Sequence, residues 1–99
     1  MNDYILLMHG DTTDQAAADD GAKWGAYMTM LHQSGQFDGG SAIGAGICAK
    51  QFGTADAASK LSGYIRVRAA SLEDAKRFLI GNPSYEAGST VEICELPRD

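Results

Sequence analysis

The chain has 99 residues, 44% of them hydrophobic and 21% charged, with a formal net charge of -5 at pH 7. This length predicts a single domain that spans residues 1–99. The acidic balance argues against nucleic-acid binding and against docking on an anionic membrane, both of which need a basic surface. No apolar run approaches the roughly 20 residues that a membrane-spanning helix needs.

The first predicted element is a strand over residues 4–8, a continuous run of five apolar side chains. Such a run is too short for a helix and is typical of a strand that is buried on both faces. It is also too short for the apolar part of a signal peptide, and no basic residue precedes it. The only cysteines, Cys48 and Cys94, make no disulfide framework. We therefore expect a reduced, cytoplasmic setting with both cysteines as small buried hydrophobic residues.

A helix is predicted over about residues 16–34, because apolar side chains recur there with helical spacing and form one stripe. Gly35 suits the position just after the helix end, where a left-handed backbone is common. His32 lies one place beyond the stripe, which favours a helix-end side chain over a site residue. The stripe, which we expect in the core, consists of Trp24, Tyr27, Met28 and Leu31.

The middle of the chain is rich in glycine and gives the weakest pattern. Residues 36–43 predict a strand or a strand pair, and the pattern leaves open whether residues 44–50 continue it past a bulge. Glycines before Ser41 would let backbone amides approach an anion with Ser41 as donor, although a bulge or tight turn is their commoner use. Residues 44–49 match a dinucleotide-binding fingerprint, but no helix pattern follows, so we predict no cofactor. Residues 51–59 predict a loop.

The last third of the chain predicts strand, helix and strand. Residues 60–68 alternate, with Tyr64 and Arg66 on the polar side. Ser71 suits a helix cap, and the apolar stripe of that helix comprises Leu72, Ala75, Phe78 and Leu79. Residues 81–83 should end the helix, residues 84–89 form a loop, and residues 90–96 form the last strand.

This order of elements predicts a ferredoxin-like βαββαβ sandwich, an α+β fold with an antiparallel sheet. One face of the sheet can pack on the two helices. The other is too apolar to be fully wet and too polar to be core, which usually marks an interface or a pocket. We expect two copies to cover it, sheet against sheet, in a two-fold homodimer with a cavity between the sheets or at the helix edges. This face carries Tyr64, Arg66, Glu92, Cys94 and Leu96.

A covered Arg66 would need a partner, because an unpaired buried charge is costly. Glu92 is the obvious candidate, either across strands of one protomer or across the dimer. The alternative is that Arg66 presents its planar guanidinium to a substrate carboxylate. Tyr64, on the same face, is a candidate pocket residue.

His9-Gly10-Asp11 is the sharpest local candidate for chemistry. A histidine at a strand end can act as a general base near neutral pH, with a carboxylate orienting its ring. Direct pairing of His9 with Asp11 needs the turn that Gly10 can provide, and Asp11 could instead close an Asx-turn. His9, Asp11 and His32 lack the spacing of a metal site, so we predict no metal.

Several segments resemble the YCII-related domain proteins, a family that includes a group known for an Asp-Gly-Pro-Phe motif. The resemblance covers nearly the whole chain. The motif itself is absent, because the sequence before the central strand is FGTADAA, residues 52–58. The segments that carry the resemblance are residues 4–11, 61–67, 71–75 with 82–83, and 88–97.

The resemblance implies a ferredoxin-like dimer that forms an α/β barrel. It also implies a pocket with a proposed histidine–aspartate catalytic pair, and His9 matches that histidine only by its place at the strand end. A few family members act on chlorinated muconate-type acids, and some are associated with sigma factors. Most have no assigned reaction.

Two functions stay open. In the first, the protein is a small enzyme that transfers a proton on a small organic acid, with His9 and Asp11 as the catalytic pair. Arg66 would hold a carboxylate of that acidic metabolite, and Ser41 and Tyr64 would complete its binding site. In the second, the same homodimer binds a metabolite or a regulatory partner without catalysis.

Overall fold

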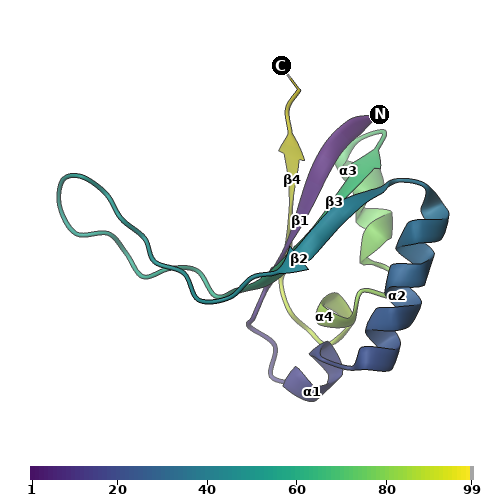
Figure 1. Cartoon of the computed structure of the whole chain (residues 1–99), viewed down its shortest axis with the longest axis horizontal. Coiled ribbons are helices and arrows are strands. Elements are labelled where there is room, and N and C mark those ends of the chain that lie inside the picture. The colour runs from purple at the N-terminus through teal and green to yellow at the C-terminus, as the bar shows by residue number, and fades with distance from the viewer. Residues whose placement is uncertain (99) are drawn as a thin grey trace.

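A computed structural model describes residues 1–98. Its sheet is antiparallel with strand order β2-β3-β1-β4, and the helices lie on one side of it (Figure 1). This arrangement confirms the predicted ferredoxin-like fold. Among the helices described, none combines the length and apolarity needed to cross a membrane. The elements are β1 (Asn2–His9), α1 (Gln15–Ala18), α2 (Gly21–Ser34), β2 (Phe37–Ala42), β3 (Leu61–Ala69), α3 (Leu72–Ala75), the 3-10 helix η1 (Lys76–Leu79), α4 (Pro83–Glu86) and β4 (Val91–Leu96).

The core lies between the sheet and the helices. Tyr4, Leu6 and Met8 of β1 point into it and are at most 4% exposed. Ile5 and Leu7 point to the opposite side and are only half-buried. The prediction that residues 4–8 are buried on both faces is therefore wrong, because no second layer of the described chain covers that side.

Helix α2 carries the predicted apolar stripe, and Tyr27 and Leu31 are confirmed as core residues. Trp24 and Met28 pack against the core but stay partly exposed, because they line a cavity. Gly35 follows the helix with φ 69°, the predicted left-handed conformation.

The helix predicted over residues 16–34 is in fact two helices, α1 and α2. Asp20 interrupts it, because its extended backbone caps α2 and its carboxylate accepts a hydrogen bond from the Lys23 amide at 3.1 Å. Asp14 caps α1 in the same way through the Ala17 amide. A capping side chain marks a helix start because it accepts from the free amides of the first turn. Asp14 and Asp20 therefore start two separate helices.

The second helical region starts as predicted, with the Ser71 hydroxyl accepting from the Asp74 amide at 3.0 Å. Leu72, however, is 51% exposed and is not part of the core, because it lies in the first turn and points outward. The loop predicted over residues 84–89 is also partly wrong. Asn82 caps a further helical turn, α4, and Pro83 at its first position suits that turn because it needs no amide donor there.

Residues 43–60 form a long projection between β2 and β3, which we call the arm (Figure 1). The arm contains neither a helix nor a strand, so residues 44–50 do not continue β2, whereas the loop predicted over residues 51–59 is confirmed. Ile47 and Phe52 are 92% and 81% exposed. Cys48 is exposed too, so the prediction that it is buried is wrong.

Candidate functional site

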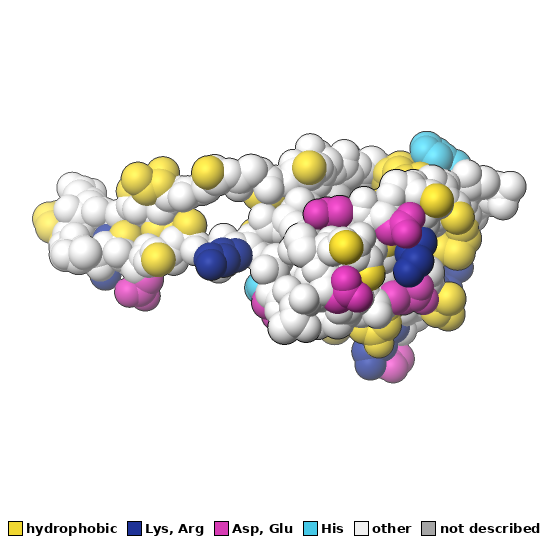
Figure 2. Space-filling model, turned by 90° about the horizontal axis from the view of Figure 1, so that it is seen from below, with side chains coloured by type: hydrophobic (Ala, Val, Ile, Leu, Met, Phe, Trp, Pro, Cys, Tyr) yellow, Lys and Arg dark blue, Asp and Glu magenta, His cyan; other side chains and the backbone are white. Residues whose placement is uncertain are grey.

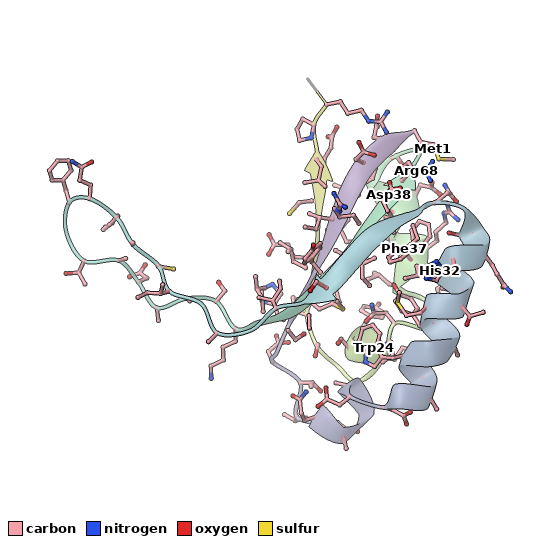
Figure 3. The ribbon with its side chains drawn as sticks, viewed as in Figure 1. Met1, Trp24, His32, Phe37, Asp38 and Arg68 are labelled. Atoms are coloured by element: carbon pink, nitrogen blue, oxygen red, sulfur yellow. The ribbon has the colours of Figure 1, made fainter. Side chains whose placement is uncertain are left out.

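A cavity of about 350 Å³ lies between α1, α2 and the edge of the sheet formed by β2 and β3. Its walls are mainly apolar and include Trp24, Met28 and Phe37, of which Trp24 and Phe37 can be followed between α2 and the sheet in Figure 3. Polar groups reach it at the rim. These are Gln15, Asp19, Ser41, Ser62 and Ser84.

The walls of the cavity are held in place by local contacts. The indole nitrogen of Trp24 donates to the Ala18 carbonyl at 2.7 Å, and its ring meets the Tyr27 ring edge to face. Gly40 allows β2 to approach β3 closely, because a side chain there would collide with the Tyr64 carbonyl oxygen. The cavity therefore depends on a missing side chain in the strand and a fixed aromatic ring on the helix.

No helix or strand within residues 1–98 covers the opposite side of the sheet, which we call the open face (Figure 1). The pairing of the strands confirms the alternation predicted for β3 and β4, because residues opposite one another point to the same side. Half-buried apolar side chains lie among charged ones on this face. It consists of Asp3, Ile5, Leu7, His9, Tyr64, Arg66, Arg68, Glu92, Cys94 and Leu96.

His9 lies at the end of β1 on the open face, and its Nε2 atom is 3.4 Å from Oε1 of Glu92 on β4. The backbone holds it there, because the His9 amide donates to the Thr90 carbonyl at 2.9 Å. The next amide, of Gly10, donates to the Lys60 carbonyl at 2.6 Å, which ties the turn to the foot of the arm. The imidazole side chain is 27% exposed, so it is screened but reachable.

Asp11 does not contact His9. Its carboxylate accepts hydrogen bonds from the Thr90 amide at 2.8 Å and from the Thr90 hydroxyl at 2.7 Å. The Thr90 hydroxyl, followed by the amide, lowers the pKa of Asp11 below its ordinary value. The structure thus places Asp11 where it fastens the start of β4, and the carboxylate beside His9 belongs to Glu92.

Arg66 points away from His9. It lies opposite Ile5, four residues before His9 along β1, which is about 13 Å for extended backbone. Its Nη2 atom donates to the Asp38 carbonyl at 2.8 Å, while the Asp38 carboxylate pairs with Arg68 at 3.0 Å (Figure 3). The prediction that Arg66 pairs with Glu92 across strands is therefore wrong within the protomer, because Glu92 pairs with His9.

Ser41 and Tyr64 lie side by side, since they pair across β2 and β3, and both line the cavity. The Ser41 hydroxyl donates to the Ala42 carbonyl at 2.9 Å. Tyr64 also neighbours Leu7 on the open face. These two predicted residues are thus brought together, whereas His9, Asp11 and Arg66 do not line this cavity.

Cys94 is half-buried on the open face and not in the core, so the prediction of two buried cysteines fails for both. Desolvation, and then the Glu92 carboxylate, raise the pKa of the Cys94 thiol. A raised pKa disfavours the thiolate, so Cys94 is a poor nucleophile at neutral pH. Across residues 1–98, no three His, Cys, Asp or Glu side chains gather closely enough to hold a metal ion.

Sequence reasoning missed Glu92 as the partner of His9. The signal was present, because Glu92 alternates onto the same face as His9. The sequence does not reveal the strand register, in which Glu92 pairs with Leu7, two residues before His9 at the end of β1. It allowed a cavity at the helix edges but did not predict its walls, because Trp24 and Met28 were assigned to the core.

The comparisons with known proteins show the fold. Neither the family models nor the curated proteins contain a match. A solved structure matches with a TM-score of 0.62 at 15% identity, covering 98% of this chain and 95% of that chain. It is the 5-chloro-2-hydroxyhydroquinone dehydrochlorinase TftG from Burkholderia phenoliruptrix AC1100, in complex with 2,5-dihydroxybenzoquinone. The chain therefore shares its fold, over 98% of its length, with this dehydrochlorinase.

Proposed function

We propose that this protein is a small enzyme, related to the YCII-related domain proteins, that moves a proton on a small organic acid or acidic hydroxylated ring. The observation that carries the proposal is the contact of His9 with Glu92 at 3.4 Å on the open face. The shared fold with a dehydrochlorinase supports it, because that enzyme's reaction is the loss of a proton and chloride from a hydroxylated ring.

The orientation of His9 gives each ring nitrogen a role. When Nε2 keeps its proton and donates a hydrogen bond to Glu92, Nδ1 has a free lone pair and can accept a proton from substrate. The Glu92 carboxylate then stabilises the imidazolium that forms. Glu92 thus takes the orienting role that the sequence suggested for Asp11, and Asp11 holds the strand that carries Glu92.

The proposal includes a homodimer in which two open faces meet. A base that is 27% exposed needs cover to exclude water from the reacting groups, and a second copy would supply it. Tyr64 and Arg66 would then line the same covered space, with Arg66 turned toward a carboxylate of one substrate or of the other copy.

A second candidate function is metabolite binding without catalysis, and the 350 Å³ cavity favours it. Its aromatic and apolar walls with a few polar rim groups are typical of small-ligand sites. Because His9 is not among its lining residues, a ligand held there would meet no general base.

The two functions are separated by one pair of measurements on the same variants. Binding of 2,5-dihydroxybenzoquinone is followed by titration calorimetry, and turnover by chloride release from 5-chloro-2-hydroxyhydroquinone. Loss of a general base costs about 100- to 10,000-fold in rate. We therefore expect His9→Ala to lose turnover by at least about 100-fold, Glu92→Gln to lose less, and both to keep most of the binding affinity.

His32→Ala is the matched control, because His32 is exposed on α2 and should leave turnover unchanged. Turnover that survives in His9→Ala would contradict the enzyme proposal. Wild-type protein that binds but never turns over, with affinity lost in Trp24→Ala and kept in His9→Ala, would establish the binding function instead. No binding at all would reject hydroxylated rings as the ligand class.

A further inference from the structure

The arm leaves the sheet on the side away from the helices, which is the side of the open face (Figure 1). Arm and open face therefore form the two walls of a corner. The arm also makes the molecule unusually extended, with a radius of gyration of 14.6 Å. A compact chain of this length has about 13 Å.

The surface of the arm is rich in apolar side chains. Nine of its 18 residues are hydrophobic, and Figure 2 shows hydrophobic side chains along both of its limbs. The outermost backbone hydrogen bond that joins its limbs among the described residues is that from the Ile43 amide to the Ser62 carbonyl, at the foot. In residues 44–58, no described amide or carbonyl has a backbone partner, and free backbone groups of this kind can pair with another chain.

The balance of charge on the open face and the arm favours a second copy of the chain as the partner. With Arg98 bound to Asp3 and Asp38 bound to Arg68, the open face and its ion pairs carry three acidic and three basic side chains, although the chain has a net charge of -5. The charged side chains of the arm are Lys50, Asp56 and Lys60. A strongly basic or acidic partner finds no opposite charge in this corner. A second copy of the chain meets a neutral, half-apolar surface identical to its own, as a two-fold interface requires.

Size agrees with this partner. The longest dimension of the molecule is 46 Å, whereas a sheet with one layer of helices is about 20 Å thick. The arm therefore reaches well beyond the about 10 Å that separates two packed sheets. A copy seated on the open face would lie alongside the arm, within reach of Ile47 and Phe52.

We propose that the arm is a clasp, which packs Ile47 and Phe52 against a second copy of the chain seated on the open face. This inference rests on the homodimer of the proposed function and adds the element that locks it. Two-fold symmetry makes the contact reciprocal, so each dimer contains two such contacts, one from each arm. The foot of the arm bonds to Gly10 beside His9, so the clasp also joins the partner to the proposed site.

Sedimentation velocity over a concentration series tests the clasp directly. The wild-type chain should dimerise at micromolar concentration, and Ile47→Ser with Phe52→Ser should raise the dimer dissociation constant by about 100-fold or more. Leu72→Ser with Ile80→Ser is the matched control, because both side chains are exposed and apolar but lie on the helical side. Circular dichroism should be unchanged in both double variants, since neither removes a core side chain.

The outcomes separate the clasp from the dimer and from the proposed chemistry. A wild-type monomer throughout would overturn clasp and dimer together. An arm variant that dimerises like the wild type, or a control pair that weakens the dimer equally, would overturn the clasp and leave the dimer standing. The His9 measurements are separate from these results, because they compare the turnover of His9→Ala with that of wild type at the same protein concentration, whatever the oligomeric state.

The two cysteines give a second readout, because Cys48 is on the arm and Cys94 on the open face. Pulse alkylation followed by peptide mass spectrometry measures each thiol separately. With the clasp formed, both thiols should react at least about tenfold more slowly in the dimer than in dilute monomer. Protection of Cys94 with Cys48 unchanged would mean that the faces meet and the arm stays free, which would overturn the proposal.

Discussion

The two faces of the sheet are built from the same strands and have opposite contents. Leu6 and Leu7 are neighbours in β1, yet Leu6 is 0% exposed beneath the helices and Leu7 is half-buried on the open face. The helical face is complete within one chain. The open face mixes half-buried apolar side chains with charged ones, and no element within residues 1–98 covers it. In the proposed dimer, a second copy would supply that cover.

The polar groups of the two faces also differ, in whether they are buried and paired or exposed to water. On the helical side, the buried Tyr27 hydroxyl donates to the Phe78 carbonyl at 2.6 Å, and every buried side-chain nitrogen or oxygen described has a partner. On the open face, the pairs His9–Glu92 and Arg68–Asp38 are exposed to water. The buried polar groups of the helical side are thus paired internally, whereas the charged groups of the open face stay accessible to water.

Truncation of the two neighbouring leucines should give the largest difference between the two faces. Leu6→Ala should lower the free energy of unfolding by about 3–4 kcal/mol, because it leaves a cavity in a packed core. Leu7→Ala should cost about 1 kcal/mol or less in dilute protein, because its side chain is partly in water already. Urea denaturation at low protein concentration measures both values.

Protein concentration then sharpens the result. If a second copy covers the open face, the cost of Leu7→Ala should grow as the concentration rises through the dimerisation range, while the cost of Leu6→Ala should not. Equal losses at every concentration would mean that the two faces are equally buried, contrary to the comparison.

A smaller effect separates the two faces through their tyrosines. Tyr27→Phe should destabilise the fold by about 1–2 kcal/mol, because it leaves the buried Phe78 carbonyl without its donor. Tyr64→Phe on the open face should change stability by less than about 0.5 kcal/mol. Thermal unfolding of the two variants beside wild type provides the measurement, and a Tyr64→Phe loss as large as that of Tyr27→Phe would contradict the assignment.

The helical face could be predicted from the sequence because its signals are local. Alternation in β3 and the stripe with Tyr27 and Leu31 depend only on spacing along one element, and Gly35 and Ser71 mark ends by their own backbone chemistry. Where a local signal was misread, another local signal overrode it. Asp20 started a new helix inside the predicted one, and Asn82 capped a turn in the predicted loop.

The site was less predictable because it depends on register and on segments without periodicity. His9 and Glu92 are 83 residues apart and meet only through the pairing of β1 with β4. The arm has glycine and alanine in place of a repeating pattern, so the sequence indicated a loop but not its reach. Proximity in sequence favoured Asp11 as the partner of His9, whereas the turn at Gly10 carries it to Thr90.

The smallest expected effect tests that reassignment of Asp11 through pH. Its pKa is lowered in the folded state by the Thr90 hydroxyl and amide, so the ionised carboxylate stabilises the fold above the unfolded pKa. This contribution is lost as pH falls through the folded value. Asp11→Asn should therefore lower the melting temperature slightly at neutral pH and flatten its decline in acid, and Thr90→Val should do the same. Asp56→Asn on the arm should follow the wild-type curve. If Asp11 instead served His9, Asp11→Asn would lower turnover and leave the acid limb of the melting curve as steep as in wild type.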